Sequence, residues 1–195
     1  METRLARIAM VVAFGFMVLG SADARSAQMS QADPQPPQAA VSVPTIAPRA
    51  EDVSSIDGIM SAFYEVISGP AGQPRQWSRD RTLYIPGVWF VSMREDAQHN
   101  PVGRVMSHQQ FVDQSNSGLV QKGFFEAEIH RETERFGNIA HIFSTYDSRI
   151  TQTGPVIARG VNSIELYWDG KRWWIVAAIW DDERSDNPIP KKLLP

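Results

Sequence analysis

The sequence predicts an α+β domain in which N-terminal helices pack against a curved antiparallel meander of four strands. From Phe124 to Asp182, β-rich runs are separated by tight-turn signals at Gly137-Asn138 and Asp169-Gly170, which are typical of hairpins. Before this region, apolar residues recur at helical spacing. A chain of 195 residues is long enough for one such domain with additional segments.

Residues 1–24 have the pattern of a secretory signal peptide. Arg4 and Arg7 precede an apolar run from Ile8 to Leu19 that is too short to span a bilayer comfortably. Ala22-Asp23-Ala24 then forms an A-x-A cleavage site. We therefore expect cleavage after Ala24 and export to the periplasm or the medium, with no membrane attachment afterwards. An uncleaved membrane anchor is the alternative.

Residues 25–53 are predicted to form a disordered tether, since they are rich in Pro, Ala and Gln and poor in large apolar residues. The chain contains no cysteine, which excludes disulfides, thiol catalysis and cysteine-bound metals. The formal net charge of −3 argues against nucleic-acid binding. The sequence has no glycine-rich phosphate motif and no nucleophile elbow, and we expect no cofactor.

The folded domain is expected over residues 54–195 and is predicted to begin with a helix. Ser54 or Ser55 can cap this helix, and Gly69-Pro70 ends it. Its apolar residues fall on one face at helical spacing: Ile56, Ile59, Met60, Phe63 and Ile67.

Shorter elements follow before the meander. Trp77 to Leu83 is a short segment of helical character, Val88 to Met93 is predicted to be a first strand, and residues 96–103 are predicted to be a loop. Ser107-x-x-Gln110 is a capping-box pattern that opens a second helix. One side of that helix carries Phe111, Val112, Ser115 and Leu119.

The first hairpin turn determines which side chains share a face of the meander. A two-residue turn at Gly137-Asn138 pairs Glu134 with His141 and Glu126 with Arg149. The resulting outer face is polar and carries, among others, Glu126, His130 and His141. The other face is mostly apolar and is expected to cover the core; its polar members are Arg131, Ser144 and Tyr146.

The second hairpin turn determines which side chains share a face in the last two strands. A two-residue turn at Asp169-Gly170 pairs Leu166 with Trp173 and Asn162 with Ala177, and it puts Asn162 on the apolar face. The opposite face is unusually apolar for an outer surface and includes Trp174, Val176 and Trp180. An exposed patch of this kind suggests a partner surface.

Several stretches are familiar from one superfamily: residues 77–84, Gly123 to Glu126, residues 136–141 with 144–146, residues 159–164, and the Trp173-Trp174 strand. They resemble the NTF2-like superfamily, which includes nuclear transport factor 2, ketosteroid isomerase, scytalone dehydratase and the SnoaL-like cyclases. The resemblance implies a cone-shaped α+β fold with a pocket between the concave sheet face and the helices. In many members this pocket binds small apolar molecules, and in the isomerase and dehydratase branches an Asp or His in it moves a proton.

The concave face supplies the candidate pocket residues. Tyr146 could donate a hydrogen bond to a ligand carbonyl and Asn162 could orient the ligand; the alternative is that both satisfy buried backbone groups. Ser144 and Arg131 share this face, whereas Trp77 and Tyr84 could line the pocket mouth or pack in the core.

His130, His141 and Glu126 are second-tier candidates for proton transfer, because histidine titrates near neutrality. The alternative for them is a solvated face with cross-strand ion pairs. The alternating pattern Glu126-x-Glu128-x-His130 could chelate a metal, but it has no further placed ligand, and we predict no metal site.

Three functional hypotheses follow, and none assigns a catalytic residue. The first is an exported accessory domain that binds a small apolar molecule without catalysis. The second is an enzyme of the isomerase, dehydratase or cyclase type that uses the same pocket. The third is a dimerisation module.

We predict a homodimer that pairs through the outer face with Trp174, Val176 and Trp180, since that face commonly mediates pairing in the resembled fold. Analytical ultracentrifugation at micromolar concentration should give twice the mass of the mature chain, and a monomer mass would contradict the prediction.

Overall fold

The structure is a computed structural model that describes residues 40–195. The predicted signal peptide, its cleavage site and residues 25–39 of the predicted tether lie outside the described residues. No helix within residues 40–195 has the length and apolar character needed to cross a bilayer.

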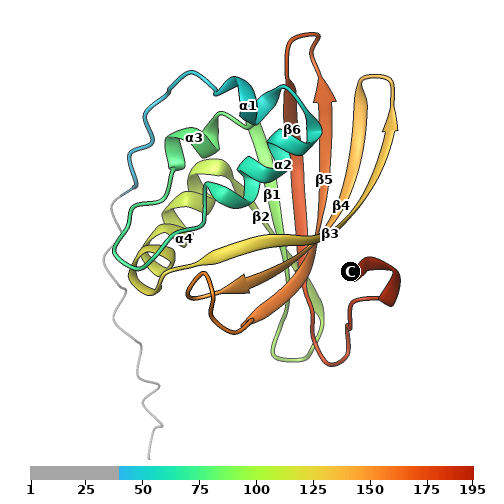
Figure 1. Cartoon of the computed structure of the whole chain (residues 1–195). Coiled ribbons are helices and arrows are strands. Elements are labelled where there is room, and N and C mark those ends of the chain that lie inside the picture. The colour runs from blue at the N-terminus through green and yellow to red at the C-terminus, as the bar shows by residue number, and fades with distance from the viewer. Residues whose placement is uncertain (1–39) are drawn as a thin grey trace, which may run out of the picture. The chain divides into compact units, whose positions relative to one another are not determined.

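The described chain is an α+β domain, as the sequence predicts, built on one six-stranded sheet (Figure 1). Its helices are α1 (Ala50–Val53), α2 (Ile56–Glu65), α3 (Trp77–Arg81), α4 (His108–Lys122) and the 3₁₀ helix η1 (Lys191–Leu193). Its strands are β1 (Tyr84–Glu95), β2 (Pro101–Ser107), β3 (Phe125–Phe136), β4 (Ile139–Arg149), β5 (Ala158–Trp168) and β6 (Trp173–Asp182).

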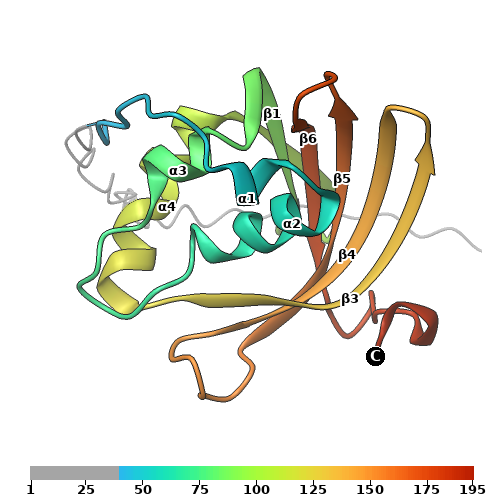
Figure 2. The same cartoon turned by 45° about the horizontal axis from the view of Figure 1, so that its top comes forward.

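The strand order in the sheet is β2-β1-β6-β5-β4-β3. Neighbouring strands are antiparallel except β1 and β6, which are parallel, so the sheet is mixed. The sheet curves around α1 to α4, and α2 lies next to β3 (Figure 2). The concave face of the sheet is therefore covered by helices, and the buried core lies between the two layers.

Both main helices begin where the sequence predicts. The Ser55 hydroxyl accepts a hydrogen bond from the Gly58 amide at 2.9 Å and caps α2. Ser107 and Gln110 form the reciprocal capping box of α4. The apolar stripe of α2 is buried against the sheet, and Ile59 and Met60 are completely inaccessible to solvent.

Strand β2 is an element that the sequence analysis did not predict. Its first residues fall in the range 96–103 that was expected to be a loop. It is an edge strand paired with β1 alone, and Pro101 is tolerated at its start because a strand end needs no donor there. Val102 and Val105 are exposed, which weakens the alternation that normally reveals a strand.

Packing begins before the expected domain boundary at Ser54. Val43 is buried in the core, and the carboxylate of Asp52 accepts two hydrogen bonds from the Arg79 guanidinium at 2.7 and 2.8 Å. Asp52 and Arg79 are both almost fully buried, so this ion pair attaches α1 to α3. The residues from Val43 to Val53 therefore belong to the folded domain.

The first hairpin follows the expected register only near its turn. Glu134 pairs with His141, as predicted, but a β-bulge at Ile129 shifts the remainder of the strand by one residue. Glu126 consequently opposes Ser148 instead of Arg149, and the expected outward direction of Glu126 is wrong. Glu126 and Glu128 turn towards the concave face, whereas His130 stays on the convex face opposite Thr145.

The second hairpin has a different register from the predicted one. The Asp169 side chain accepts hydrogen bonds from the amides of Lys171 and Arg172, both at 2.8 Å, and this stabilises a four-residue loop in place of a two-residue turn. Trp168 therefore pairs with Trp173, and a bulge at Val176 adds a further shift.

These shifts alter the predicted dimer face. Asn162 lies opposite Trp180 and both belong to the concave side of the sheet, so Trp180 is not on the outer surface. Trp174 lies on the face opposite to the buried Trp173, with the Arg172 guanidinium 3.7 Å above its ring. The homodimer stays a prediction.

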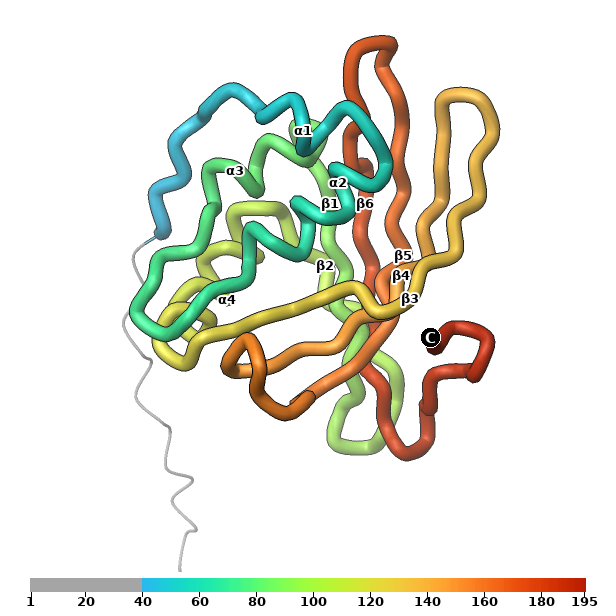
Figure 3. The backbone as a smooth tube through the Cα atoms, in the orientation of Figure 1, coloured from blue at the N-terminus to red at the C-terminus, as the bar shows by residue number. Residues whose placement is uncertain are grey.

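The C-terminal segment turns back from the end of β6 towards β3 and β4 (Figure 3). The Thr145 hydroxyl donates to the Leu193 carbonyl at 2.7 Å, and Ile189 and Leu193 are buried. Because Thr145 points away from the helices, this segment covers part of the convex face.

Candidate ligand-binding cavity

A cavity of about 310 Å³ lies between the concave face of the sheet and the helices. Most of its wall is aromatic and aliphatic, and the aromatic residues that line it are Phe63, Tyr84, Phe90, Phe111, Phe124, Tyr146 and Trp180. Its volume is at the lower end of the range typical of small-molecule sites.

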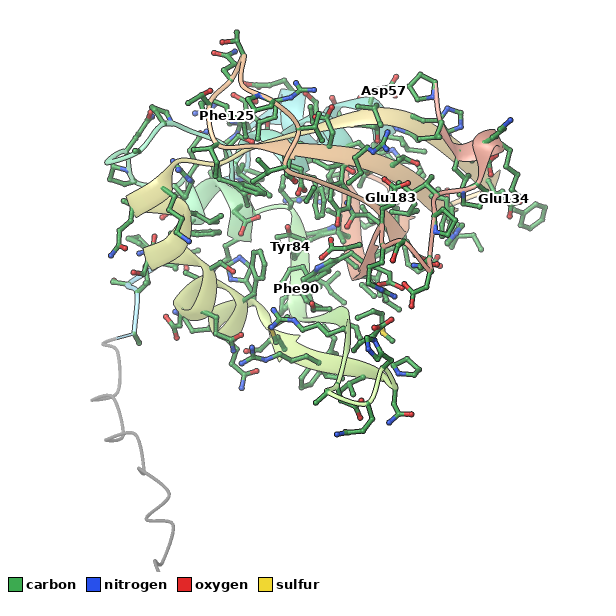
Figure 4. The ribbon with its side chains drawn as sticks, turned by 90° about the horizontal axis from the view of Figure 1, so that it is seen from below. Asp57, Tyr84, Phe90, Phe125, Glu134 and Glu183 are labelled. Carbon is green, nitrogen blue, oxygen red and sulfur yellow. The ribbon has the colours of Figure 1, made fainter. Side chains whose placement is uncertain are left out.

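Separate elements supply the aromatic wall. Tyr84 and Phe90 from β1 lie next to each other in the interior, edge to face with ring centroids 5.1 Å apart (Figure 4). Phe111 from α4 contacts Phe90 and Trp180, at centroid distances of 5.1 and 6.0 Å. Aromatic pairs prefer such edge-to-face and tilted contacts, which therefore stabilise this part of the wall.

The polar groups of the cavity enter mainly from the sheet. They are Glu126 on β3, Tyr146 and Ser148 on β4, Asn162 on β5 and Asp182 on β6, together with Ser115 on α4. Among the described residues that line the cavity, two are acidic and none is basic. The cavity therefore has mainly apolar walls and one acidic region, formed by Glu126 and Asp182.

Glu126 is half-buried and reaches the cavity because of the bulge at Ile129. Burial raises the pKa of its carboxyl to about 8. The Ser148 hydroxyl donates a hydrogen bond to Glu126 Oε2 at 3.0 Å, which lowers the pKa and partly opposes this effect. The nearby charges of Asp182 and Asp147 raise the pKa further. At neutral pH this carboxyl is mainly protonated, and it can donate a hydrogen bond as well as accept one.

Tyr146 donates its hydroxyl proton to Asp182 Oδ1 at 2.6 Å. Burial, followed by this hydrogen bond and the charge of Asp182, raises the pKa of the phenol, so Tyr146 stays neutral. The expected donation from Tyr146 to a ligand carbonyl would require this bond to change.

Gly160 makes the contact between Tyr146 and Asp182 possible. Gly160 lies on β5 between the two residues, and a Cβ atom there would come within 2.3 Å of the Tyr146 hydroxyl. Only a residue without a side chain lets the phenol cross β5 to reach β6.

Asn162 and Ser144 belong to a buried hydrogen-bond network. The Asn162 amide donates to the Tyr64 hydroxyl at 3.0 Å, and Tyr64 is 2.6 Å from the Ser144 hydroxyl. Ser144 also donates to Glu128, whose carboxylate pairs with Arg131 at 2.7 Å. Burial raises the pKa of the Tyr64 phenol. This network fixes Asn162 at the edge of the cavity.

The remaining predicted residues lie at or outside the cavity wall. Tyr84 lines the cavity, and its hydroxyl donates to Asp80 at 2.9 Å. Arg131 instead extends to Asp57 at 2.6 Å. Trp77 is buried in the core, where its indole donates to Asn116 at 2.7 Å.

Neither of the two predicted histidines lines the cavity. His141 is partly exposed, and its Nδ1 atom lies within hydrogen-bonding distance, 2.7 Å, of Glu165 on the neighbouring strand. His130 lies on the convex face beside the C-terminal segment. Of the three proton-transfer candidates, only Glu126 therefore reaches the cavity. Within residues 40–195 no group of three or more His, Asp or Glu side chains is placed to hold a metal ion.

Sequence reasoning missed several cavity residues. Ser148 follows Ser144 and Tyr146 at the strand period and could have been found from that alternation. Asp182 and Trp180 could not have been found from that alternation, because the bulge at Val176 turns their side chains to the other face of the sheet.

Three solved structures illustrate what the fold is similar to. A protein of unknown function with a cystatin-like fold from Nostoc punctiforme is 6% identical, with 72% of this chain and 97% of that chain covered and a TM-score of 0.51. A candidate beta subunit of an aromatic-ring-hydroxylating dioxygenase from Novosphingobium aromaticivorans is 12% identical, with 72% and 94% covered and a TM-score of 0.51. An NTF2-like protein of unknown function from Shewanella baltica is 15% identical, with 67% and 92% covered and a TM-score of 0.44, which is too low to carry an argument by itself.

No protein-family model matches the chain, and no curated protein is significantly similar to it. At these identities the solved structures show the fold alone. The chain is an α+β domain whose fold is similar to those of the Nostoc punctiforme and Novosphingobium aromaticivorans proteins.

The raised pKa of Glu126 predicts how stability changes with pH. In the unfolded chain this carboxyl ionises near its ordinary value of 4.5, whereas the folded protein holds the proton up to about pH 8. Between these values the folded state binds more protons, so its free energy of unfolding falls as pH rises. We expect the Glu126→Gln variant to lose this contribution and to gain stability relative to the wild type as pH increases.

Urea denaturation between about pH 5 and about pH 9 measures the effect. Glu132→Gln is the matched control, because Glu132 lies on the same strand and is exposed. Parallel pH curves for the wild type and Glu126→Gln would show that the carboxyl is not buried as described.

Proposed function

We propose that the domain binds a small, mainly apolar molecule in this cavity. The observation that carries the proposal is the aromatic wall around a cavity of about 310 Å³, whose hydrogen-bonding groups come mainly from the sheet. Such a site removes the apolar part of a ligand from water and orients it through a few polar contacts.

Export of the chain is part of the same proposal and rests on the signal-peptide pattern of residues 1–24. An exported binding domain without cysteine would depend on its core for stability, and the buried ion pair between Asp52 and Arg79 adds a polar attachment within that core.

Filling the cavity should abolish binding of a neutral apolar probe. Ser115 lies on the cavity wall, and Ser115→Phe would place a ring in the space of about 310 Å³. We expect naphthylethanol to bind the wild type with a dissociation constant of about 10–100 μM, and at least about tenfold more weakly to the variant. Isothermal titration calorimetry measures both.

Gln114→Phe is the matched control, because the neighbouring Gln114 is exposed and the same ring would stay outside the cavity. Equal affinity of naphthylethanol for the wild type and Ser115→Phe, or no binding to the wild type, would contradict the proposal.

Proton transfer is a second candidate function, favoured by the pKa of about 8 of a carboxyl that faces an apolar cavity. A general acid or base works best when its pKa lies near the operating pH. In this mechanism ionised Glu126 would take a proton from a carbon next to a ligand carbonyl and return it to another position.

The exchange of such protons in tetralone, followed by NMR in deuterated water, tests this second candidate. We expect the wild type to accelerate the exchange at least about a hundredfold over buffer and Glu126→Gln to lose the acceleration. Glu132→Gln should keep it. An exchange rate equal to that in buffer would contradict the proton-transfer function and would leave the proposed binding function unaffected.

A further inference from the structure

We propose that the cavity selects hydrophobic amines: ligands with an apolar body and one protonated nitrogen placed between Glu126 and Asp182. This inference rests on the proposed binding function and specifies the charge of the ligand.

The two acidic groups of the cavity have no positive partner within residues 40–195. Glu126 accepts a side-chain hydrogen bond from Ser148 alone, and Asp182 accepts one from Tyr146 alone. Neither carboxyl takes part in an ion pair in this part of the chain. Each therefore keeps an oxygen that can accept from a ligand.

The other acidic side chains near the cavity are already paired. Glu128 pairs with Arg131 at 2.7 Å, Asp147 with Arg149 at 2.5 Å, and Asp80 contacts both His108 and Tyr84. Buried carboxyls are expected to have such partners. Within the described residues Glu126 has no such partner, and a cationic ligand would supply one, with the exposed Asp182 as a second acceptor.

The titratable groups that act on Glu126 come from α2, β4 and β6, and none of them is cationic. Tyr64 on α2, Tyr146 and Asp147 on β4 and Asp182 on β6 are its titratable neighbours. The two tyrosines stay neutral, so the field at Glu126 is set by the two aspartates. Asp147 is paired with Arg149, so a positive charge in the cavity would be attracted by Asp182 and by Glu126 once it ionises, whereas a carboxylate ligand would be repelled by Asp182.

The aromatic wall reinforces the preference for a cation. Protonated amines are attracted to the faces of aromatic rings, most strongly to tryptophan, and this attraction grows when water is excluded. Phe90, Phe111 and Trp180 form a contiguous part of the wall, and Trp180 is on the strand that carries Asp182. The apolar body of an amine would pack against the same rings.

Binding of an amine should release a proton. In the free protein Glu126 is mainly protonated at pH 7, because burial raises its pKa to about 8. A cation beside it favours the ionised form and displaces that proton to solvent. A neutral alcohol of the same shape has no such effect.

The experiment compares three probes with the same ring system and different charges: naphthylethylamine, naphthylethanol and naphthylacetate. Isothermal titration calorimetry at pH 7, in two buffers with different ionisation enthalpies, gives both the affinity and the number of protons released. We expect the amine to bind at least about tenfold more tightly than the alcohol, the acetate to bind most weakly, and about one proton to leave with the amine.

Glu126→Gln and Asp182→Asn should each lower the ratio of the amine affinity to the alcohol affinity, whereas Glu132→Gln should leave all three affinities unchanged. Asp182 is exposed, and an asparagine in its place keeps an oxygen that can accept the hydrogen bond from Tyr146. Thermal denaturation verifies that each variant is folded.

Equal affinities for amine and alcohol would overturn this inference and leave the proposed binding function intact. A preference for the amine that persists in Glu126→Gln combined with Asp182→Asn would also overturn it. Binding of none of the three probes would contradict the proposed function itself.

Discussion

The cavity chemistry of this domain depends on the bulge at Ile129. One extra residue in β3 turns Glu126 from the solvated side of the sheet into an apolar cavity, where Ser148 is its sole side-chain hydrogen-bond donor within residues 40–195. The surrounding fold has to stabilise a carboxyl that would be better hydrated outside. Carboxyls whose pKa values are raised in this way cluster at functional sites.

The remainder of the cavity is built around that carboxyl by ordinary packing. Helices α2 and α4 cover the concave face, and their apolar stripes supply the wall opposite the sheet. Gly160 lets Tyr146 reach Asp182, so the acidic region is ordered by a rigid contact between β4 and β6. The result is an aromatic cavity with two acidic groups. It favours the hypothesis of a small-molecule binding domain over that of a dimerisation module.

The sequence predicted the fold class, the two capped helices and the register next to the Gly137-Asn138 turn, because these features depend on local spacing. It could not predict the bulges at Ile129 and Val176, which depend on contacts across the sheet. Each bulge reverses the direction of every residue beyond it. Tyr146 and Asn162 were therefore placed correctly towards the cavity, whereas Glu126 and Trp180 were placed on the wrong face.

The most direct test of this account is the ionisation of Glu126 in the ligand-free protein, followed by carbon-13 NMR of its labelled side-chain carboxyl, with Glu126→Gln used to assign the signal. We expect a titration midpoint of about 8. A midpoint near the ordinary value of 4.5 would show that the carboxyl is surrounded by water, and it would contradict both the inward turn at Ile129 and the cavity chemistry derived from it.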